Sequence, residues 1–398
     1  MTNASHKGFP PAGILYRAPV YGASGYADEN LLVLMELAGR GVPVQLLAEG
    51  QQSDGKKLLP VDMRQRLVEM QRTQVDPGRS IFYQCVPGNA FSCDMAGQRN
   101  IGRTTFETDR IPDDWAERCS EFDEIWVPTE FNRETFARSG IDRRKLRVMP
   151  EGIDTEIYRP GLVPLDIPER RSFTFLSVFD WQQRKGPDVL LRAFAAEFRA
   201  DEDVALVLKV TTINQPWLDV EARLAWFLER EVGVALEAVA PIILLNGLLP
   251  RADLPRLYAA ADAFVLPTRG EGWGRPYGEA LACGKPVIAT RWGGQLDFLG
   301  DHNSYLIDIE GVLPVPADLD LEVFAGHCWA EPSVEHLRRL MRHVFSHREE
   351  AMGRAAIGRC EMVEKWDGRR IATLFADALA CLLDGASLPD AVARTTAD

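Results

Sequence analysis

Two glutamates, Glu271 and Glu279, stand eight positions apart around a glycine-rich turn, in the segment EGWGRPYGE. The apolar run before this turn predicts a buried strand, and Pro276 fits the first turn of a following helix, where its missing N–H costs no hydrogen bond. Gly272 and Gly274 would let bare backbone approach a ligand, and the free N–H groups of a helix start bind anions. Two carboxylates beside an anion site suit a sugar diphosphate that carries a ribose, because its hydroxyls flank the phosphates. The structural alternative is a strand-to-helix turn with a solvated glutamate.

A pair of cations, Arg184 and Lys185, directly precedes a second predicted helix at residues 187–198. This helix begins at a proline and has a leucine-rich face that predicts burial against a sheet. Cations beside a helix N-terminus are a strong combination for binding a diphosphate. The alternative is an exposed basic turn, whose ion pairs would contribute little to stability.

A shorter glycine pattern, with Gly22 and Gly25, joins the first predicted strand to its helix. Glu49 at the end of the next predicted strand invites a dinucleotide-binding interpretation. The spacing is G-x-x-G, however, and lacks the G-x-G-x-x-G pattern that brings backbone onto a pyrophosphate. We therefore interpret the segment as a loop that a ligand can approach closely, and a dehydrogenase remains a remote alternative.

Glu107 follows another predicted strand, at residues 102–106, so its carboxylate could point into a cleft at the strand ends. It is a candidate acid, base or hydroxyl-binding group. The alternative is a solvated carboxylate on a loop. Since the histidines fall at position 6 and then from 302 onward, the first half of the chain cannot supply a histidine base for such a cleft.

Two patterns that could suggest metal binding receive structural interpretations. His343 and His347 lie four positions apart on a predicted helix, and without an acidic third ligand nearby in the sequence they read as a polar helix face. Asp318 and Asp320 resemble a metal–diphosphate motif but lie in a loop punctuated by proline. We therefore expect no metal site and no bound cofactor.

Apolar runs alternate with amphipathic stretches along the whole chain, which predicts two α/β domains with parallel sheets. In the first half, strands are predicted at 13–17, 42–47, 80–85, 102–106, 124–127 and 147–150, and helices at 26–39 and 132–139. In the second half, strands are predicted at 173–178, 205–210, 242–245, 263–266 and 286–289, and helices at 187–198, 218–231, 252–261, 275–283, 333–345, 349–365 and 369–383. Residues 154–168, rich in proline and glycine, are the best linker. A ligand is expected in the cleft that the carboxyl ends of the strands face.

Composition and charge narrow the classes of function. The chain has 398 residues, 46% hydrophobic, and a net charge of −13, which disfavours nucleic-acid binding because phosphate contact needs a surplus of cations. Residues 1–160 are nearly neutral, with 20 Lys and Arg against 23 Asp and Glu, so this half could approach an anionic membrane surface. Seven cysteines without a C-x-x-C pair fit a reducing compartment, and from the apolar patterning we expect no signal peptide and no membrane span. We expect a cytoplasmic protein, with peripheral contact at the inner face of the membrane as an option.

Taken together, these motifs resemble the retaining glycosyltransferases of family 4, which have the GT-B fold. The most specific part of the resemblance is the second half, in the run LPT…EGWG…EALACGKPVIAT…GG from residue 266 to residue 294. The stretch PEGID at 150–154, followed by Pro160, is similar to the family's interdomain segment. The resemblance implies two Rossmann-like doubly wound domains facing a central cleft, at 1–160 on the acceptor side and 161–368 on the nucleotide-sugar side. Residues 369–398 would form a helix that returns to the first domain and a frayed tail.

The resemblance also implies roles for single residues. Glu279 would hold the ribose hydroxyls and Glu271 those of the donor sugar, and Lys185 would stabilise the leaving diphosphate. Gly272, Trp273 and Gly274 would offer backbone amides near sugar and phosphate, and Gly22 would lie under the diphosphate from the opposite domain. Main-chain groups near 247–249 are expected to read the base. Glu107, Lys185 and Glu271 are thus the catalytic candidates, with Arg184 as a further cation for the donor.

The sequence departs from the family pattern at two positions. Phe179 stands where many members have an arginine, so Arg184 could supply the second charge, and Glu107 stands where many members have a cleft histidine. The expected reaction moves a sugar from a UDP- or GDP-sugar to a hydroxyl of a saccharide or a lipid-linked glycan, with retention of anomeric configuration. A nucleotide-sugar epimerase of the same fold and a non-catalytic sugar-nucleotide-binding subunit are the alternatives. The base, the sugar and the acceptor remain open at this point.

Overall fold

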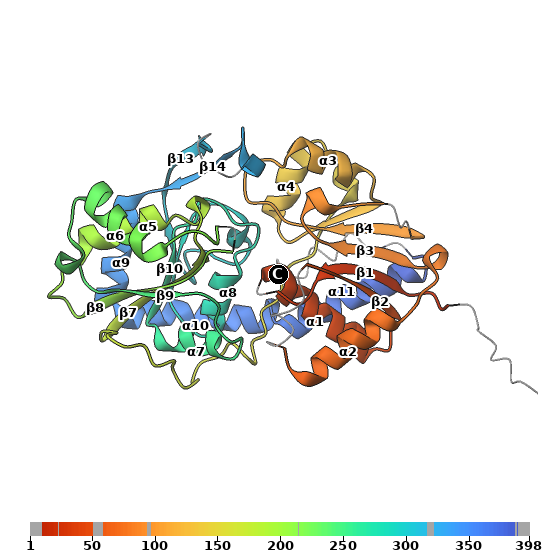
Figure 1. The fold of residues 1–398 in the computed structure, drawn as a ribbon, viewed down its shortest axis with the longest axis horizontal. Helices are drawn as coiled ribbons and strands as arrows, with labels where there is room; N and C mark the ends of the chain where they lie inside the picture. The colour runs from red at the N-terminus through yellow and green to blue at the C-terminus, as the bar shows by residue number, and fades with distance from the viewer. Residues whose placement is uncertain are drawn as a thin grey trace, which may run out of the picture.

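The computed structural model describes residues 10–22, 24–50, 59–93, 97–213, 215–316, 322–386 and 388. Within these ranges the chain forms two six-stranded sheets, each covered by helices, and a two-stranded hairpin. The first sheet and its helices lie in one half of the molecule and the second sheet in the other, as Figure 1 shows. Both six-stranded sheets are parallel throughout. This architecture confirms the predicted pair of doubly wound α/β domains.

The N-terminal domain has the strand order β2-β1-β3-β4-β5-β6. Its strands are β1 (Ile14–Pro19), β2 (Val44–Glu49), β3 (Ile81–Cys85), β4 (Arg99–Arg103), β5 (Glu124–Val127) and β6 (Leu146–Val148), and its helices are α1 (Gly25–Gly39), α2 (Val61–Arg72), α3 (Asp113–Ser120) and α4 (Glu130–Arg138). Side-chain caps mark where helices begin. The Ser24 hydroxyl accepts a hydrogen bond from the Ala27 N–H at the start of α1, and Thr129 does the same for Asn132 at the start of α4.

The C-terminal domain has the strand order β12-β11-β10-β7-β8-β9. Its strands are β7 (Phe173–Asp180), β8 (Val204–Thr211), β9 (Ile242–Asn246), β10 (Ala263–Leu266), β11 (Val287–Thr290) and β12 (Tyr305–Ile307). Its helices are α5 (Pro187–Glu197), α6 (Val220–Phe227), α7 (Asp253–Ala260), α8 (Arg275–Ala282), α9 (Val334–Ser346) and α10 (Arg348–Lys365). Strands β8 and β9 follow β7 on one side of the sheet, and β11 and β12 follow β10 on the other. The direction of the strand order therefore reverses between the neighbouring strands β7 and β10.

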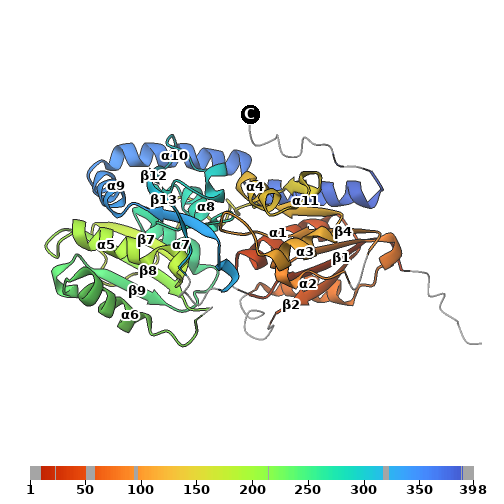
Figure 2. The same ribbon diagram turned by 90° about the horizontal axis from the view of Figure 1, so that it is seen from above.

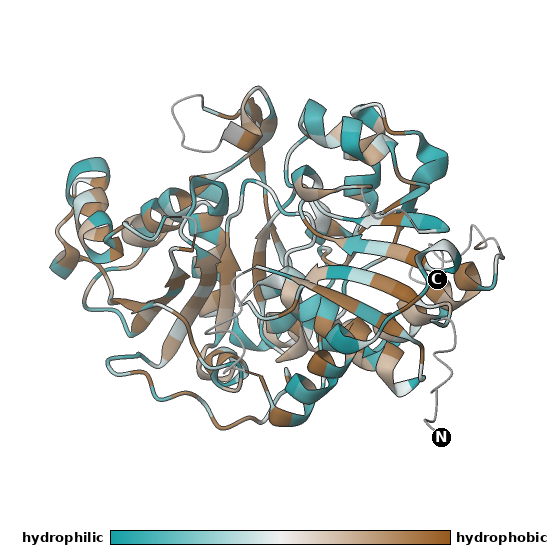
Figure 3. Cartoon of the chain, turned by 45° about the vertical axis from the view of Figure 1, so that its right-hand side comes forward, coloured by the Kyte–Doolittle hydropathy of each residue, from teal (hydrophilic) through white to brown (hydrophobic). Residues whose placement is uncertain are grey.

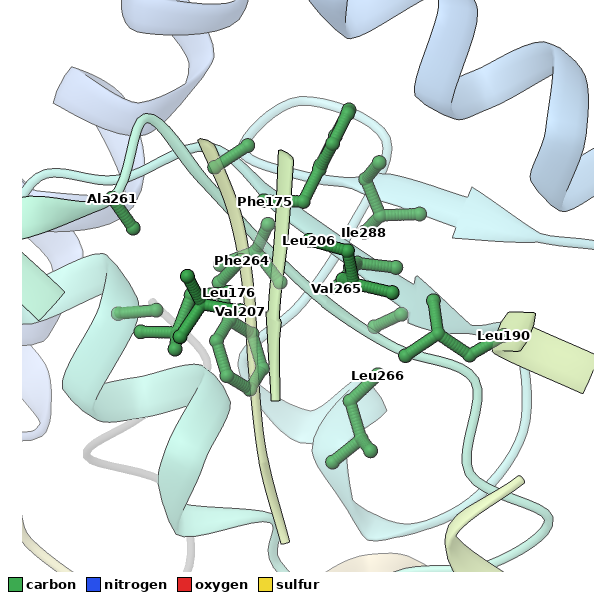
Figure 4. Packing of buried hydrophobic residues seen from close by; sticks show 14 of the residues in the cluster. Phe175, Leu176, Leu190, Leu206, Val207, Ala261, Phe264, Val265, Leu266 and Ile288 are labelled. Carbon is green, nitrogen blue, oxygen red and sulfur yellow. The ribbon is translucent and has the colours of Figure 1, made fainter. Parts of the chain in front are cut away.

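Large apolar side chains of adjacent strands form the core of this domain. The buried residues labelled in Figure 4 come from β7, β8, β10 and β11, from helix α5 and, in the case of Ala261, from the end of helix α7. A strand buried on both faces reads as a continuous apolar run, as in Ala263–Leu266, because helices cover both sides of a parallel sheet. Hydrophobic residues are concentrated in the strands and hydrophilic residues on the outer helices, as Figure 3 shows. Among the described helices, none combines the length and the apolar character that crossing a bilayer requires.

The last helix, α11 (Gly368–Leu383), packs on the N-terminal domain beside α1, as Figure 2 shows. Its Phe375 and Leu379 belong to the same buried cluster as Leu34 of α1. The chain therefore crosses between the domains twice. The two crossings run side by side, because the Ile153 N–H donates to Trp366 O and the Gly368 N–H donates to Ile153 O.

A hairpin of β13 (Ile309–Pro314) and β14 (Cys328–Pro332) extends from the second domain to the first, across the top of the view in Figure 1. Its root is tied to its own domain by Arg269, which forms paired hydrogen bonds with Glu331 at 2.7 and 2.8 Å. Its far end packs into the N-terminal domain, where Phe324 and Trp329 join a buried cluster with Phe106. The hairpin is thus a third connection between the domains, made by packing.

The predicted elements agree with most of the observed ones, and the differences have physical causes. Strands 124–127 and 263–266 have the bounds of β5 and β10. Helices α2 and α3 were not predicted, because polar residues dominate both and few of their side chains are buried. Strand β4 begins at Arg99 instead of 102, since its first residues are polar. The hairpin strands were also not predicted, because β13 exposes most of its side chains and lacks an apolar run.

Candidate active site

A cavity of about 1640 Å³ lies between the two domains. The nine residues singled out from the sequence all line it: Gly22, Glu107, Arg184, Lys185, Glu271, Gly272, Trp273, Gly274 and Glu279. They come from loops that follow strands of both sheets and from the start of helix α8. The structure therefore brings together residues separated by up to 257 positions in the sequence.

The site lies where the strand order reverses in the second sheet. Neighbouring strands β7 and β10 continue in opposite directions there, which leaves a crevice at their carboxyl ends. The loop after β7 carries Arg184 and Lys185, and the loop after β10 carries Glu271. In the first sheet, β1 lies between β2 and β3, and the loop that follows β1 carries Gly22. Both domains therefore present their binding loops at equivalent points of the doubly wound fold.

Four charged side chains meet in the middle of the cavity. Lys185 Nζ lies 2.5 Å from Glu271 Oε1, and Arg184 Nη1 lies 3.4 Å from Glu271 Oε2. Arg184 Nη2 lies 3.2 Å from Glu107 Oε1, which belongs to the opposite domain. The Arg184 Nη1 atom also donates to Gly270 O at 2.6 Å. Two cations and two carboxylates thus form one network that spans the cleft.

Burial sets the ionisation of this network. Removal from water, together with the neighbouring Arg184, lowers the pKa of Lys185. Burial also opposes ionisation of Glu271, but Lys185 and Arg184 outweigh it, so that the pKa of Glu271 falls below its usual value. In a desolvated pair of this kind, an anionic ligand can replace the carboxylate as the partner of the cations. A diphosphate would do so effectively, because it is a stronger partner than a single carboxylate.

Glu279 lies in helix α8, with its carboxylate in the same cavity. Its Oε2 accepts a hydrogen bond from the Tyr258 hydroxyl at 2.8 Å, which fixes the orientation of the carboxylate. Burial raises the pKa of Glu279. The hydrogen bond from Tyr258 uses only part of the accepting capacity of this carboxylate. Its remaining oxygen lone pairs can accept hydrogen bonds from ligand hydroxyls, as the expected contact with ribose requires.

The turn before α8 has a backbone conformation that requires glycine at one position. Gly274 caps the helix with φ at 88°, and a Cβ there would lie 2.7 Å from Tyr277 Cδ2. The side chain of Trp273 is buried against Phe298 and Trp366, with ring centroids 4.8 and 5.1 Å apart. Trp273 therefore anchors the turn through its indole. Only its backbone amide is available for the contact with a ligand that the sequence predicts.

Gly272 has a second role, at the contact between the domains. A Cβ at this position would overlap Thr105 Oγ1 of the N-terminal domain. The Gly272 carbonyl accepts a hydrogen bond from Thr129 Oγ1 at 3.0 Å. Gly270 is equally confined, since a Cβ there would overlap the Glu107 carbonyl oxygen. These glycines let the two domains approach closely enough for Glu107 to reach Arg184.

Sequence reasoning missed two further cation–carboxylate pairs across the cleft. Arg251, after β9, pairs with Asp28 of α1, and Arg275, at the start of α8, lies 3.3 Å from Glu151 Oε2. All four side chains line the cavity. Each member is an ordinary charged residue in the sequence, and its partner is more than 120 positions away. Arg275 could have been noticed, because it adjoins the predicted anion site.

Lys209 is another residue that the sequence interpretation did not include. It lies near the end of strand β8, and its Nζ donates hydrogen bonds to the carbonyl oxygens of Val210 and Gly247. Burial lowers its pKa to about 8. Lys209 lines the cavity together with Leu248 and Leu249, and these two leucines belong to the stretch 247–249 that is expected to read the base.

Of the two candidate metal patterns, the histidine pair lies at the end of helix α9. His343 Nε2 lies within hydrogen-bonding distance of Glu350 Oε2, at 2.6 Å. The His343 ring stacks on that of His347, with ring centroids 4.2 Å apart. Neither histidine lines the central cavity. Asp318 and Asp320 lie outside the described residues. Across the residues that are described, no three or more His, Cys, Asp or Glu side chains converge in a way that could hold a metal ion.

Comparisons with known proteins agree with this geometry. Residues 170–313 match the family described as glycosyl transferases group 1. The chain is 31% identical over 162 residues to D-inositol 3-phosphate glycosyltransferase 1 of Catenulispora acidiphila, which covers 39% of this chain and 37% of that protein. It is 28% identical over 218 residues to the GDP-mannose-dependent alpha-(1-6)-phosphatidylinositol monomannoside mannosyltransferase of Mycolicibacterium smegmatis, covering 50% of this chain and 53% of that one. These matches thus span about half or less of each relative.

Solved structures match over nearly the whole chain. Sucrose-phosphate synthase from Thermosynechococcus elongatus superposes with a TM-score of 0.68 at 15% identity, over 94% of this chain and 100% of that one. HepE of Anabaena in complex with UDP-glucose superposes with a TM-score of 0.62 at 15% identity, over 92% and 99% of the two chains. At these identities the likeness establishes the fold. The resemblance seen in the sequence thus agrees with the comparisons: residues 170–313 match the glycosyl transferases group 1 family, within a chain that has the GT-B fold.

Proposed function

We propose that this protein is a retaining hexosyltransferase that moves a sugar from a UDP- or GDP-sugar to a hydroxyl of a saccharide or a lipid-linked glycan. The observation that carries the proposal is the buried network of Arg184, Lys185 and Glu271 beside the start of α8. It combines two cations, a helix N-terminus and a carboxylate, which is the set of groups that a diphosphate and an adjoining sugar require. The activities after which the two relatives are named, one of them dependent on GDP-mannose, support the same class of donor.

In the proposed donor complex, the diphosphate lies between the loop of Gly22 and the start of α8. A Cβ at Gly22 would come no closer than 3.9 Å to the nearest atom, Ser24 Oγ, so the space beside this glycine is open for a phosphate. Arg184 and Lys185 bind the diphosphate oxygens, and Glu271 then accepts hydrogen bonds from hydroxyls of the sugar. Glu279 accepts hydrogen bonds from the ribose.

The proposed reaction proceeds on one face of the sugar. The bond from the anomeric carbon to the diphosphate oxygen breaks, with the electron pair leaving on that oxygen. Arg184 and Lys185 stabilise the negative charge as it develops. The acceptor hydroxyl forms the new bond from the same face and passes its proton to the departing oxygen, so the configuration is retained. No metal ion or cofactor is needed in this scheme, because the two cations and the helix start carry the charge.

Glu107 faces this reaction from the acceptor domain. Its position against Arg184 suits a group that binds and orients the acceptor hydroxyl. A two-step route, in which Glu107 attacks the anomeric carbon and a glycosyl–enzyme intermediate forms, is the less favoured version. The pairing of Glu107 with Arg184 speaks for the first role, because a nucleophile held by a cation is less reactive.

A two-stage experiment tests the proposal. Thermal-shift measurements with UDP-, GDP-, ADP- and dTDP-sugars identify the donor, because a ligand that binds the native state raises the midpoint of unfolding. The donor is then incubated with saccharide and lipid-linked acceptors, and the anomeric configuration of the product is read by NMR. We expect stabilisation by a UDP- or GDP-sugar and a product of retained configuration. An inverted product would reject retention.

The same experiment separates the alternatives. A nucleotide-sugar product formed without acceptor would indicate an epimerase. Donor binding with neither transfer nor hydrolysis would indicate a non-catalytic subunit, and stabilisation by NAD would indicate a dehydrogenase.

If the acceptor is lipid-linked, the nearly neutral N-terminal domain is the side that we expect at an anionic surface. Co-sedimentation with phosphatidylglycerol vesicles, measured for the whole chain, tests that contact.

A further inference from the structure

Arg275 occupies a distinctive position at the start of α8. It is the first residue of this helix, in the donor-side domain, and its side chain extends to the glycine loop of the opposite domain. A Cβ on Gly25 would lie 3.0 Å from Arg275 Cδ. The guanidinium continues to the crossing between the domains, where Nη1 lies 3.3 Å from Glu151 Oε2 and 3.2 Å from Gly152 O. Arg275 thus lies between the two structures that would enclose a diphosphate.

One nitrogen of this buried guanidinium has no partner. The Arg275 side chain is 11% exposed, and its Nε has no hydrogen-bond acceptor among the described residues. A buried N–H without an acceptor destabilises the folded state, so a protein rarely retains one without a reason. Arg184, in the charge network described above, likewise has an unpartnered Nε, and both side chains line the same cavity. The two orphan donors point to an anion with more than one acceptor oxygen.

The surroundings of Arg275 select the class of anion. The start of α8 contributes the positive end of a helix dipole, which favours a phosphate over a neutral group. Glu151, its present partner, is a single carboxylate with one contact at 3.3 Å, longer than the distances of about 2.7–2.9 Å usual for strong charge-assisted hydrogen bonds. A diphosphate has several oxygens and more charge, and so competes effectively for the guanidinium.

We propose that Arg275 is a third cation of the donor site, binding the diphosphate together with Arg184 and Lys185, and that Glu151 is its counter-ion when the site is empty. The proposal rests on the proposed function, since it takes a nucleoside diphosphate as the ligand. It assigns Arg275 a binding role and Glu151 a competing one. The two residues therefore have opposite effects on affinity.

The position of Glu151 links donor binding to the crossing between the domains. Glu151 and Gly152 directly precede Ile153, which pairs with the returning crossing at Trp366 and Gly368. When the diphosphate takes the guanidinium, the contacts of Arg275 with Glu151 and with Gly152 O are released. The donor thus acts on the segment about which the domains would rotate.

Isothermal titration of the whole chain tests the proposal with three ligands: the nucleoside diphosphate identified by the thermal-shift panel, its monophosphate and its nucleoside. We expect Arg275→Met to raise the Kd of the diphosphate about tenfold or more and to leave nucleoside binding unchanged. Arg339→Met changes an exposed arginine on α9, is the matched control and should bind as wild type. Equal diphosphate affinity in Arg275→Met and wild type would overturn the proposal while the proposed function stands. Absence of diphosphate binding to wild type would reject the proposed function itself.

A second variant covers the case in which Arg275→Met fails to fold. At pH 8, where Glu151 is ionised, Glu151→Gln removes the competing charge and keeps the shape of the side chain, so we expect the Kd of the diphosphate to fall severalfold. An unchanged or higher Kd in Glu151→Gln would contradict the role of Glu151 as counter-ion. A loss of affinity for the nucleoside that equals the loss for the diphosphate would indicate a purely structural role for Arg275.

Discussion

Arg184 Nη2 lies 3.2 Å from Glu107 Oε1, and this contact joins the donor-side domain to the acceptor-side domain at the centre of the cavity. The Arg184 side chain is 8% exposed and Glu107 is 22% exposed, so the pair is largely withdrawn from water. Burial opposes ionisation of Arg184, yet Glu107 and Glu271 raise its pKa, so it stays fully charged at every physiological pH. One cation is thus shared between Glu271, proposed to bind the donor sugar, and Glu107, proposed to bind the acceptor.

Lys185→Ala should slow transfer strongly. Removing this cation leaves the developing charge of the diphosphate without one of its stabilising partners, and we expect kcat to fall about 10²–10³-fold. The measurement is steady-state transfer with the identified donor. Lys365→Ala, on α10, removes a lysine outside the cavity and serves as the control. Turnover close to wild type in Lys185→Ala would show that the diphosphate role is assigned to the wrong residue.

Glu279→Ala should weaken donor binding more than it slows chemistry. The carboxylate is expected to accept hydrogen bonds from the ribose, and losing them should raise the Kd of the donor about tenfold. Titration calorimetry with the nucleotide sugar measures this. Tyr258→Phe removes the hydroxyl that orients Glu279 and keeps the carboxylate, so it should have a smaller effect of the same sign. Unchanged affinity in Glu279→Ala would rule out the ribose contact.

Glu107→Gln distinguishes the two proposed routes. If Glu107 binds and orients the acceptor, the amide should retain part of this function, and we expect a higher acceptor KM with a loss of kcat of about 10–100-fold. Mass spectrometry of wild-type protein quenched during turnover should detect no sugar attached to Glu107. A glycosylated Glu107 peptide, together with complete loss of transfer in Glu107→Gln, would establish the two-step route instead.

Glu151 should make stability depend on pH. Burial, and then the neighbouring Glu29, raise the pKa of Glu151 from the usual 4.5 to about 7, while Arg275 and Arg103 lower it in part. Between these two pH values the folded protein keeps a proton that the unfolded chain has released. The free energy of unfolding therefore falls as the pH rises through this window.

Glu151→Gln removes this dependence. We expect the variant to gain on the order of 1–3 kcal/mol relative to wild type between pH 5 and pH 8, because glutamine resembles the protonated acid. Urea denaturation at both pH values measures the difference. Asp201→Asn changes a carboxylate outside the cavity that is paired with Arg199, and should lack this gain. A stability difference between Glu151→Gln and wild type that stays constant from pH 5 to pH 8 would contradict the prediction.

The residues predicted for the donor side all line the cavity, and the sequence could indicate them because their signals are local. Gly274, Pro276 and Glu279 lie within six positions, and a strand followed by a helix start orients them without help from the rest of the chain. Arg184 and Lys185 were found for the same reason. In each case the covalent neighbours provide both the chemistry and the geometry.

The contacts across the cleft could not be predicted in this way. Glu151 and Arg275 are 124 positions apart, and nothing in either segment indicates the other. Gly272 was interpreted as a close-approach residue for a ligand, whereas the structure places Thr105 against it. Such pairs depend on how two separately folded sheets meet, which is a property of tertiary packing and not of local pattern.

The hairpin of β13 and β14 holds the loop that carries Glu107. The Asp109 N–H donates to Cys328 O at 3.0 Å, the Cys328 N–H donates to Asp109 Oδ1 at 2.7 Å, and Thr108 Oγ1 lies 2.9 Å from His327 Nδ1. Any widening of the cleft must break these bonds or carry the hairpin away from Arg269 and its own domain. The hairpin thereby makes the residence time of a ligand depend on contacts that the ligand itself never touches.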